Sequence, residues 1–277
     1  MIEALFAVAL VAAVPIGARI AVTSTNPTAW AARPWAASAI ALAIGGAAGA
    51  LLLDRGPMAA ILAGPWWLVS VALALAAVVP VVAEVVARRA AAGPSRLGLL
   101  AAVGFLVVGA TWAVIDRAGL EPFGFGRTIV LLTAVHFHVA GFVLTLAGAL
   151  AARERPGPAI TIAVGALIVG TPLTALGFFG FPVVSWVGAL LVAGGGIGIG
   201  AATLVIARRL PDGLARACLV SGGATLFVTM PLAAAYATGT TFGIGFLDIP
   251  AMAALHGGLN VVGFAIPTMI GWRRIVR

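Results

Sequence analysis

Runs of about twenty apolar residues, separated by short breaks that carry arginine, recur along the chain and constrain its fold most. Runs of that length cross the hydrocarbon core of a bilayer as helices. Backbone amides in lipid must bond within the protein, so only helices or a closed barrel can span it, and barrel strands alternate over about ten residues. Charged residues are only 9% of the sequence, which leaves no room for a soluble domain. The chain is predicted to be all-α, a polytopic transmembrane helical bundle forming a single transmembrane domain, 1–277.

Nine spans are predicted from these runs, and the arginines orient them. All sixteen basic residues are arginine, and nine spans place twelve on one side and three on the other, with Arg19 inside the first span. Cytoplasmic loops carry such an excess, so the N-terminus is predicted outside and the C-terminus inside. The three outer arginines are Arg55, Arg117 and Arg127. The predicted spans are 3–22, 35–53, 65–87, 97–116, 128–151, 158–178, 182–206, 214–236 and 250–271.

Two similar passages suggest an internal repeat. The stretch 123–126 reads FGFG and precedes His136, and the stretch 242–245 reads FGIG and precedes His256. Both run from outside to inside in the nine-span arrangement. They predict a weak parallel repeat of 35–151 and 158–271.

Charge and cysteine content exclude several classes of protein. The formal charge of +8 does not indicate nucleic-acid binding, because the arginines stand one to three at a time at span ends. A single cysteine, Cys218, cannot form a disulfide within one chain. The first twenty residues lack the basic start and clear cleavage site of a signal peptide, so we expect a retained span. We expect a multi-pass protein of the bacterial plasma (inner) membrane.

The three histidines, His136, His138 and His256, all fall within predicted spans. An ionisable side chain at that depth is a candidate functional residue, and the alternative is a neutral imidazole bonded to a neighbouring helix. Residues two apart on a regular helix point about 200° apart, so His136 and His138 would face one ion only if the helix were distorted, for which Gly141 is nearby. No metal and no other cofactor is predicted. We expect one of these two rings to face a cavity and the other to pack against a helix.

Two pairs have the four-residue spacing that places side chains on one helix face. Asn260 can orient His256, and Asp116 lies one turn beyond Trp112 at the outer mouth. The alternatives are that Asp116 pairs with an outer arginine and that Trp112 is an interfacial belt residue. The predicted catalytic residues are His136, His138, His256, Asp116 and Asn260. The predicted substrate-binding residues are Trp112, Thr133, Thr171, Thr174, Tyr236 and Phe142.

Two sequence blocks show a family resemblance. The block GRTIVLLTAVHFHVAGF at 126–142 and the block MAALHGGLNVVGF at 252–264 resemble the signatures of YndJ-like membrane proteins. Leu255 stands where the second signature has threonine, and valines at 261–262 replace its Ala-Leu, which alters packing more than chemistry. The family name carries a transporter label, and the resemblance implies which residues matter rather than an activity.

Three functions remain open from the sequence. The first is a membrane-embedded enzyme that uses His and Asp as acid and base for isomerisation, cyclisation or epoxide opening. Its substrate would be lipophilic, such as a terpenoid or polyketide. The alternative is a proton-coupled secondary transporter of a small molecule, and the third is a structural or assembly subunit. The expected partners are the lipid bilayer and the lipophilic substrate, and the oligomeric state is not predicted.

Overall fold

The computed structural model describes residues 1–25, 34–88, 92–245 and 247–276. Within these ranges the regular structure is helical and contains no β-strand. The predicted all-α class is confirmed. Three of the arginines that were counted to orient the spans lie outside the described residues; they are Arg33, Arg89 and Arg277.

The chain divides into two compact units, which we call the N-terminal unit (residues 2–143) and the C-terminal unit (residues 144–275). Each is described by itself. The boundary falls inside the fifth predicted span and not in the loop between the two halves of the predicted repeat. The prediction of a single domain with a weak parallel repeat stays a prediction.

The N-terminal unit begins with a bent span. Helix α1 (Ile2–Ala12) and helix α2 (Val14–Thr25) meet at Ala13, with a bend of 41°. Pro15 has no amide proton for the carbonyl four residues before it, and its ring crowds the preceding turn. The predicted first span, 3–22, therefore corresponds to two helices with a proline-induced bend.

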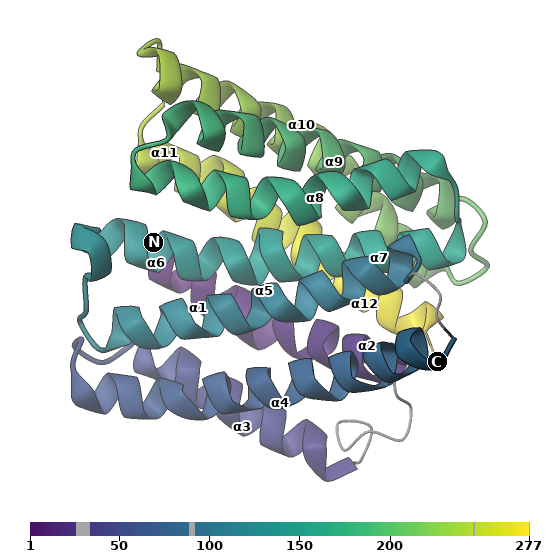
Figure 1. The fold of residues 1–277 in the computed structure, drawn as a ribbon, viewed down its shortest axis with the longest axis horizontal. Helices are drawn as coiled ribbons and strands as arrows, with labels where there is room; N and C mark the ends of the chain where they lie inside the picture. The colour runs from purple at the N-terminus through teal and green to yellow at the C-terminus, as the bar shows by residue number, and fades with distance from the viewer. Residues whose placement is uncertain (26–33, 89–91, 246, 277) are drawn as a thin grey trace. The chain divides into compact units, whose positions relative to one another are not determined.

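The rest of the N-terminal unit is a set of antiparallel helices. Helices α3 (Pro34–Ala50), α4 (Pro57–Arg88) and α5 (Pro94–Arg117) lie side by side (Figure 1). Each begins at a proline, whose fixed φ and missing amide proton suit the first helical position. The third span was predicted as 65–87, with residues 57–64 left open as a loop, a re-entrant turn or the start of that span. Helix α4 begins at Pro57, so these residues are the start of the span. Pro65 lies inside the helix and does not end it.

The fifth predicted span is one continuous helical segment of three parts. Helix α6 (Arg127–His136) follows a short 3-10 turn η2 (Pro122–Gly124), a π-helical segment η3 (Phe137–Leu144) comes next, and α7 (Thr145–Glu154) completes it in the C-terminal unit. In a π-helix each amide bonds to the carbonyl five residues back, and such turns occur frequently at functional sites. The π-helical segment begins directly after His136.

The C-terminal unit is built from long helices joined by short turns. Helices α8 (Pro158–Leu176), α9 (Pro182–Ala207) and α10 (Gly213–Phe242) lie side by side, with the 3-10 turn η4 (Gly177–Phe179) between the first two (Figure 1). A Cβ on Gly200 would lie 2.9 Å from the carbonyl oxygen of Gly223, so these glycines allow α9 and α10 to approach closely.

The last predicted span also contains π-helical turns. It comprises α11 (Ile249–Met252), the π-helical segments η5 (Ala253–Gly257) and η6 (Asn260–Ala265), and α12 (Ile266–Ile275). His256 lies in η5, and Asn260 begins η6.

Each of the nine predicted spans corresponds to helix in the structure. Among the described residues, seven helices are long and apolar enough to cross a membrane, and the bent pair α1 and α2 makes eight. Helix α3 is apolar but has only 17 residues. The chain is a multi-pass helical membrane protein, and the count of nine and the orientation stay predictions.

Candidate functional site

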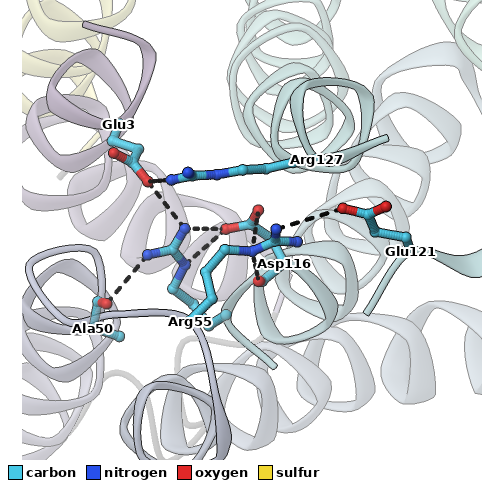
Figure 2. Close-up of polar contacts among 7 residues, drawn as sticks. Glu3, Ala50, Arg55, Asp116, Glu121 and Arg127 are labelled. Atoms are coloured by element: carbon cyan, nitrogen blue, oxygen red, sulfur yellow. Dashed lines mark hydrogen bonds and ion pairs between the residues drawn. The ribbon is translucent and has the colours of Figure 1, made fainter. Parts of the chain in front are cut away.

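Charged residues at one end of the N-terminal unit form a six-membered cluster, which we call the outer charge cluster after the side on which its arginines were predicted (Figure 2). Its members come from the start of α1, the loop that precedes α4, the end of α5, the residue before η2 and the first residue of α6. The alternating helix directions bring these helix ends together, as the span order predicted. The members are Glu3, Arg55, Asp116, Arg117, Glu121 and Arg127.

The Asp116–Arg117 pair is the buried centre of the outer charge cluster. Arg117 Nε donates to Asp116 Oδ2 at 2.7 Å, and Nη2 also contacts that oxygen. Nη1 reaches the carbonyl of Ala50 at 3.4 Å, at the end of α3. Arg55 Nε donates to the Asp116 carbonyl at 2.8 Å, and its Nε lies 3.7 Å from Asp116 Oδ1. Asp116 therefore pairs with Arg117 and Arg55.

Glu3 and Glu121 complete the cluster at its exposed rim. Glu3 Oε1 accepts from Nη2 of Arg127 at 2.7 Å and from Nη2 of Arg117 at 3.1 Å. Glu121 lies 3.6 Å from Arg55. Three arginines face three carboxylates, so the cluster has no formal net charge. This arrangement favours the structural alternative for Asp116, because breaking a buried ion pair is expensive.

His138 is buried at a junction of three other segments of the N-terminal unit. Its Nδ1–H donates to the carbonyl of Ala134 at 2.8 Å, and its Nε2 accepts from the indole Nε1–H of Trp66 at 3.0 Å. The ring of Phe6 approaches edge-on, with centroids 5.1 Å apart. A Cβ on Gly109 would lie 2.7 Å from Nδ1, so the imidazole occupies space that only glycine leaves free.

Both ring nitrogens of His138 are therefore used. A proton on Nε2 would point at the N–H of Trp66, which cannot accept, so the arrangement fits only the neutral ring. His138 matches the packed ring expected for one of the two neighbouring histidines.

His136 lies in a different environment two residues earlier. Its side chain is exposed in the structure. The ring Nδ1–H donates to the carbonyl of Leu132 at 2.7 Å, which leaves the lone pair of the neutral imidazole on Nε2. Within the part of the chain that the structure describes, Nε2 has no hydrogen-bond partner. His136 and His138 thus point in different directions, as helix geometry predicted.

The third histidine belongs to a polar network of the C-terminal unit. His256 Nδ1–H donates to the carbonyl of Thr229 at 3.0 Å, and His256 Nε2 accepts from Asn260 Nδ2 at 3.1 Å. Asn260 Oδ1 accepts from the Thr229 hydroxyl at 3.0 Å. Thr229 and Asn260 are buried, whereas His256 is half-buried. Asn260 contacts the imidazole as its spacing predicted.

The predicted substrate-binding residues of the N-terminal unit occupy three settings. Trp112 is half-buried and stacks on Phe125, with ring centroids 6.4 Å apart. The Thr133 hydroxyl bonds to the carbonyl of Ile129 at 2.8 Å. Phe142 is fully buried in the π-helical segment.

Those of the C-terminal unit are equally dispersed. Thr171 is buried, and its hydroxyl has no partner among the described residues. The Thr174 hydroxyl donates to the carbonyl of Gly170 at 2.9 Å. Tyr236 is half-buried on α10.

The predicted site residues divide between the two units. His256, Asn260, Thr171, Thr174 and Tyr236 lie in the C-terminal unit, and the others lie in the N-terminal unit. A cavity shared by all of them stays a prediction. The structure also identifies Trp66 and Thr229 as partners that the sequence did not single out. Both are polar groups inside apolar spans, and that is the signal a sequence offers for such residues.

The described residues contain no group of three or more His, Cys, Asp or Glu side chains that could hold a metal ion. The independence of the chemistry from metal and cofactor stays a prediction.

Comparison with known proteins finds a similarity that includes the two signature blocks and extends beyond them. The family described as YndJ-like protein matches residues 4–264. The chain is also similar to the "Uncharacterized membrane protein YndJ" of Bacillus subtilis (strain 168), with 28% identity over 214 residues. That match covers 75% of this chain and 37% of the relative, so the chain spans well under half of the relative's length. No solved structure matches.

Proposed function

The chain belongs to the YndJ-like family of membrane proteins, and on that premise we propose that it is a membrane-embedded acid–base enzyme centred on His136. Its substrate is lipophilic and enters from the bilayer. The reaction is an isomerisation, a cyclisation or the opening of an epoxide. It needs no metal, because the imidazole supplies and removes the protons.

The hydrogen-bond state of His136 carries this proposal. A general base must touch the proton that it removes, so it needs a ring nitrogen that the protein does not occupy. His136 offers Nε2, while the bond from Nδ1 to Leu132 fixes the tautomer and the ring orientation. His138 offers no free nitrogen.

The position of His136 supports a substrate from the membrane. It lies about nine residues into the span that starts at Arg127, which is about 14 Å at the helical rise. That depth is near the middle of the hydrocarbon core. In an isomerisation or cyclisation, Nε2 takes a proton from one substrate atom, and the resulting imidazolium returns it to another. In epoxide hydrolysis, Nε2 takes the proton from the attacking water and returns it to the epoxide oxygen, so the ring is regenerated in each case.

Loss of the imidazole should identify the substrate. Cells of the native host that carry His136→Gln should accumulate a compound extractable into organic solvent, because Gln cannot accept a proton at this position. Wild-type protein in liposomes should convert the purified compound into an isomer of equal mass, or a product heavier by one water if an epoxide is hydrolysed. Turnover by His136→Gln liposomes at the wild-type rate would refute the proposal.

Proton-coupled transport is the second candidate, and the network around His256 favours it. Two of its three members are buried within predicted spans, where polar side chains frequently belong to ion pathways. A carrier would accumulate the compound unchanged in liposomes only when a pH gradient is imposed. The enzyme would convert it chemically without a gradient.

A further inference from the structure

We infer that His256, Asn260 and Thr229 form a proton-binding site in which the Asn260 amide turns over when the imidazole takes up a second proton. Thr229 and Asn260 are the positioning residues of this site. The inference is independent of the acid–base role of His136, so failure of one leaves the other intact.

The first observation is a surplus hydrogen-bond acceptor in the network. The Thr229 hydroxyl lies 3.2 Å from the carbonyl of Thr225 and 3.0 Å from Asn260 Oδ1. A hydroxyl has one hydrogen, so it cannot serve both acceptors fully. With the neutral ring, the network has one fewer donor than it can use.

The second observation is that a half-turn of the Asn260 amide can reverse the direction of its hydrogen bonds without moving any atom far. The two ends of an asparagine amide are nearly equal in size, and one donates while the other accepts. After a half-turn, Oδ1 accepts from a protonated Nε2, and Nδ2 donates to the Thr229 hydroxyl oxygen. That hydroxyl then donates to Thr225 alone, and His256 Nδ1 keeps its bond to the Thr229 carbonyl.

Counting bonds in the two states shows why a proton fits. The neutral state has three hydrogen bonds among these groups: from His256 Nδ1, from Asn260 Nδ2 and from the Thr229 hydroxyl. The protonated state has four, because the added proton supplies the missing donor. His138 provides the contrast, since its Nε2 faces the indole N–H of Trp66, which has no acceptor end to turn toward it.

Other titratable groups on the elements packed against His256 are remote along the chain. Tyr236 and Cys218 on α10 lie about two helical turns or more from Thr229, and Asp248 lies about two turns before His256. Arg216 is close to the start of α10, and Arg273 and Arg274 are in the last turn of α12. The hydrogen bonds from which the inference is argued all join neutral groups.

Nitrogen-15 spectra of histidine-labelled protein in bilayers can test the site, with His256→Gln used to assign the signals. As the pH is lowered, both ring nitrogens of wild-type His256 should become protonated and keep hydrogen bonds. Asn260→Leu should require a proton concentration about ten-fold higher or more, because the new N–H loses its acceptor. Thr229→Val should shift the transition in the same direction by less, and Thr229→Ser should leave it unchanged.

Asn260→Asp provides an opposite test if the leucine variant does not fold. A carboxylate has the shape of the amide but only accepts, so His256 should hold its second proton at a lower proton concentration than in the wild type. An unchanged transition in both Asn260→Leu and Asn260→Asp would overturn the inference. So would a shift with Thr229→Ser as large as with Thr229→Val.

Discussion

At the scale of single residues, three identical imidazoles acquire three different states from their partners. His136 keeps one nitrogen unoccupied, His138 has both nitrogens bonded to groups that fit only the neutral ring, and His256 is bonded to an amide that can reverse. The sequence predicted that His136 and His138 diverge, because helix geometry fixes that angle. It did not predict Trp66 as the partner of His138, since that contact joins residues 72 apart in the chain.

His138 should act on stability rather than on chemistry. His138→Leu should lower the free energy of unfolding in detergent by about 1–3 kcal/mol, because it leaves the buried Trp66 indole without an acceptor. The double variant Trp66→Phe/His138→Leu should lose less than the sum of the two single variants, since neither polar group remains. Strict additivity of the three values would contradict a direct bond.

At the scale of elements, side chains at helix ends fix how neighbouring helices meet. In the N-terminal unit, Arg117 links the end of α5 to Glu3 on α1 and to the carbonyl of Ala50 at the end of α3. In the C-terminal unit, Asp212 caps α10 and also pairs with Arg274 of α12, with 2.6 Å between Oδ2 and Nε. Both contacts follow helix boundaries that the sequence predicted to within a few residues, although their pairing needed the fold.

The buried and exposed arginines of the outer charge cluster should contribute differently to the free energy of unfolding. Arg117→Met should destabilise the protein by about 3–5 kcal/mol, because it leaves Asp116 buried without its main partner. Arg127→Met, with a side chain 54% exposed, is the matched control and should cost about 1 kcal/mol or less. Equal losses of unfolding free energy would show that burial does not set the strength of this cluster.

The cap of α10 should give the protein an acid-sensitive contact. The backbone amide of Ala215 and the side chain of Arg274 hold the pKa of Asp212 below its ordinary value of 3.8. A lowered folded pKa means that the stabilisation is present above the unfolded value and is lost as the pH falls through the folded one. Asp212→Asn keeps the cap but not the charge, so its stability should approach that of the wild type below about pH 3.8. A difference that stays constant from pH 6 down to pH 2 would contradict this.

At the scale of the whole molecule, hydropathy predicted the all-α membrane class, which the structure confirms, whereas the orientation inferred from arginine placement stays a prediction. Length and composition alone placed each predicted span on helix among the described residues, because lipid allows so few alternatives. The bend at Pro15 and the π-helical turns depended on backbone details that periodicity does not encode. Gly141 and Phe142 lie in η3, and Gly263 and Phe264 lie in η6, which fits the predicted repeat without establishing it.

The orientation can be tested with a reporter that is active only in the cytoplasm. Nine spans require activity when it is fused after Arg277 and silence when it is fused after Thr240. A third fusion, after Asp54, tests whether the short helix α3 crosses the bilayer and should be silent. Activity after both Thr240 and Arg277 would refute the nine-span arrangement and place Asp116 on the opposite side.

The central claim is that Nε2 of His136 is unoccupied, and the reactivity of this nitrogen tests the claim directly. Diethyl pyrocarbonate acylates an imidazole nitrogen that carries a free lone pair and partitions into lipid, so it can be applied to the protein in liposomes. Mass spectrometry of the peptides should find His136 acylated first, with His138 and His256 much slower, because their nitrogens are already bonded. Acylation of His138 at the rate of His136, or an unreactive His136, would contradict the account.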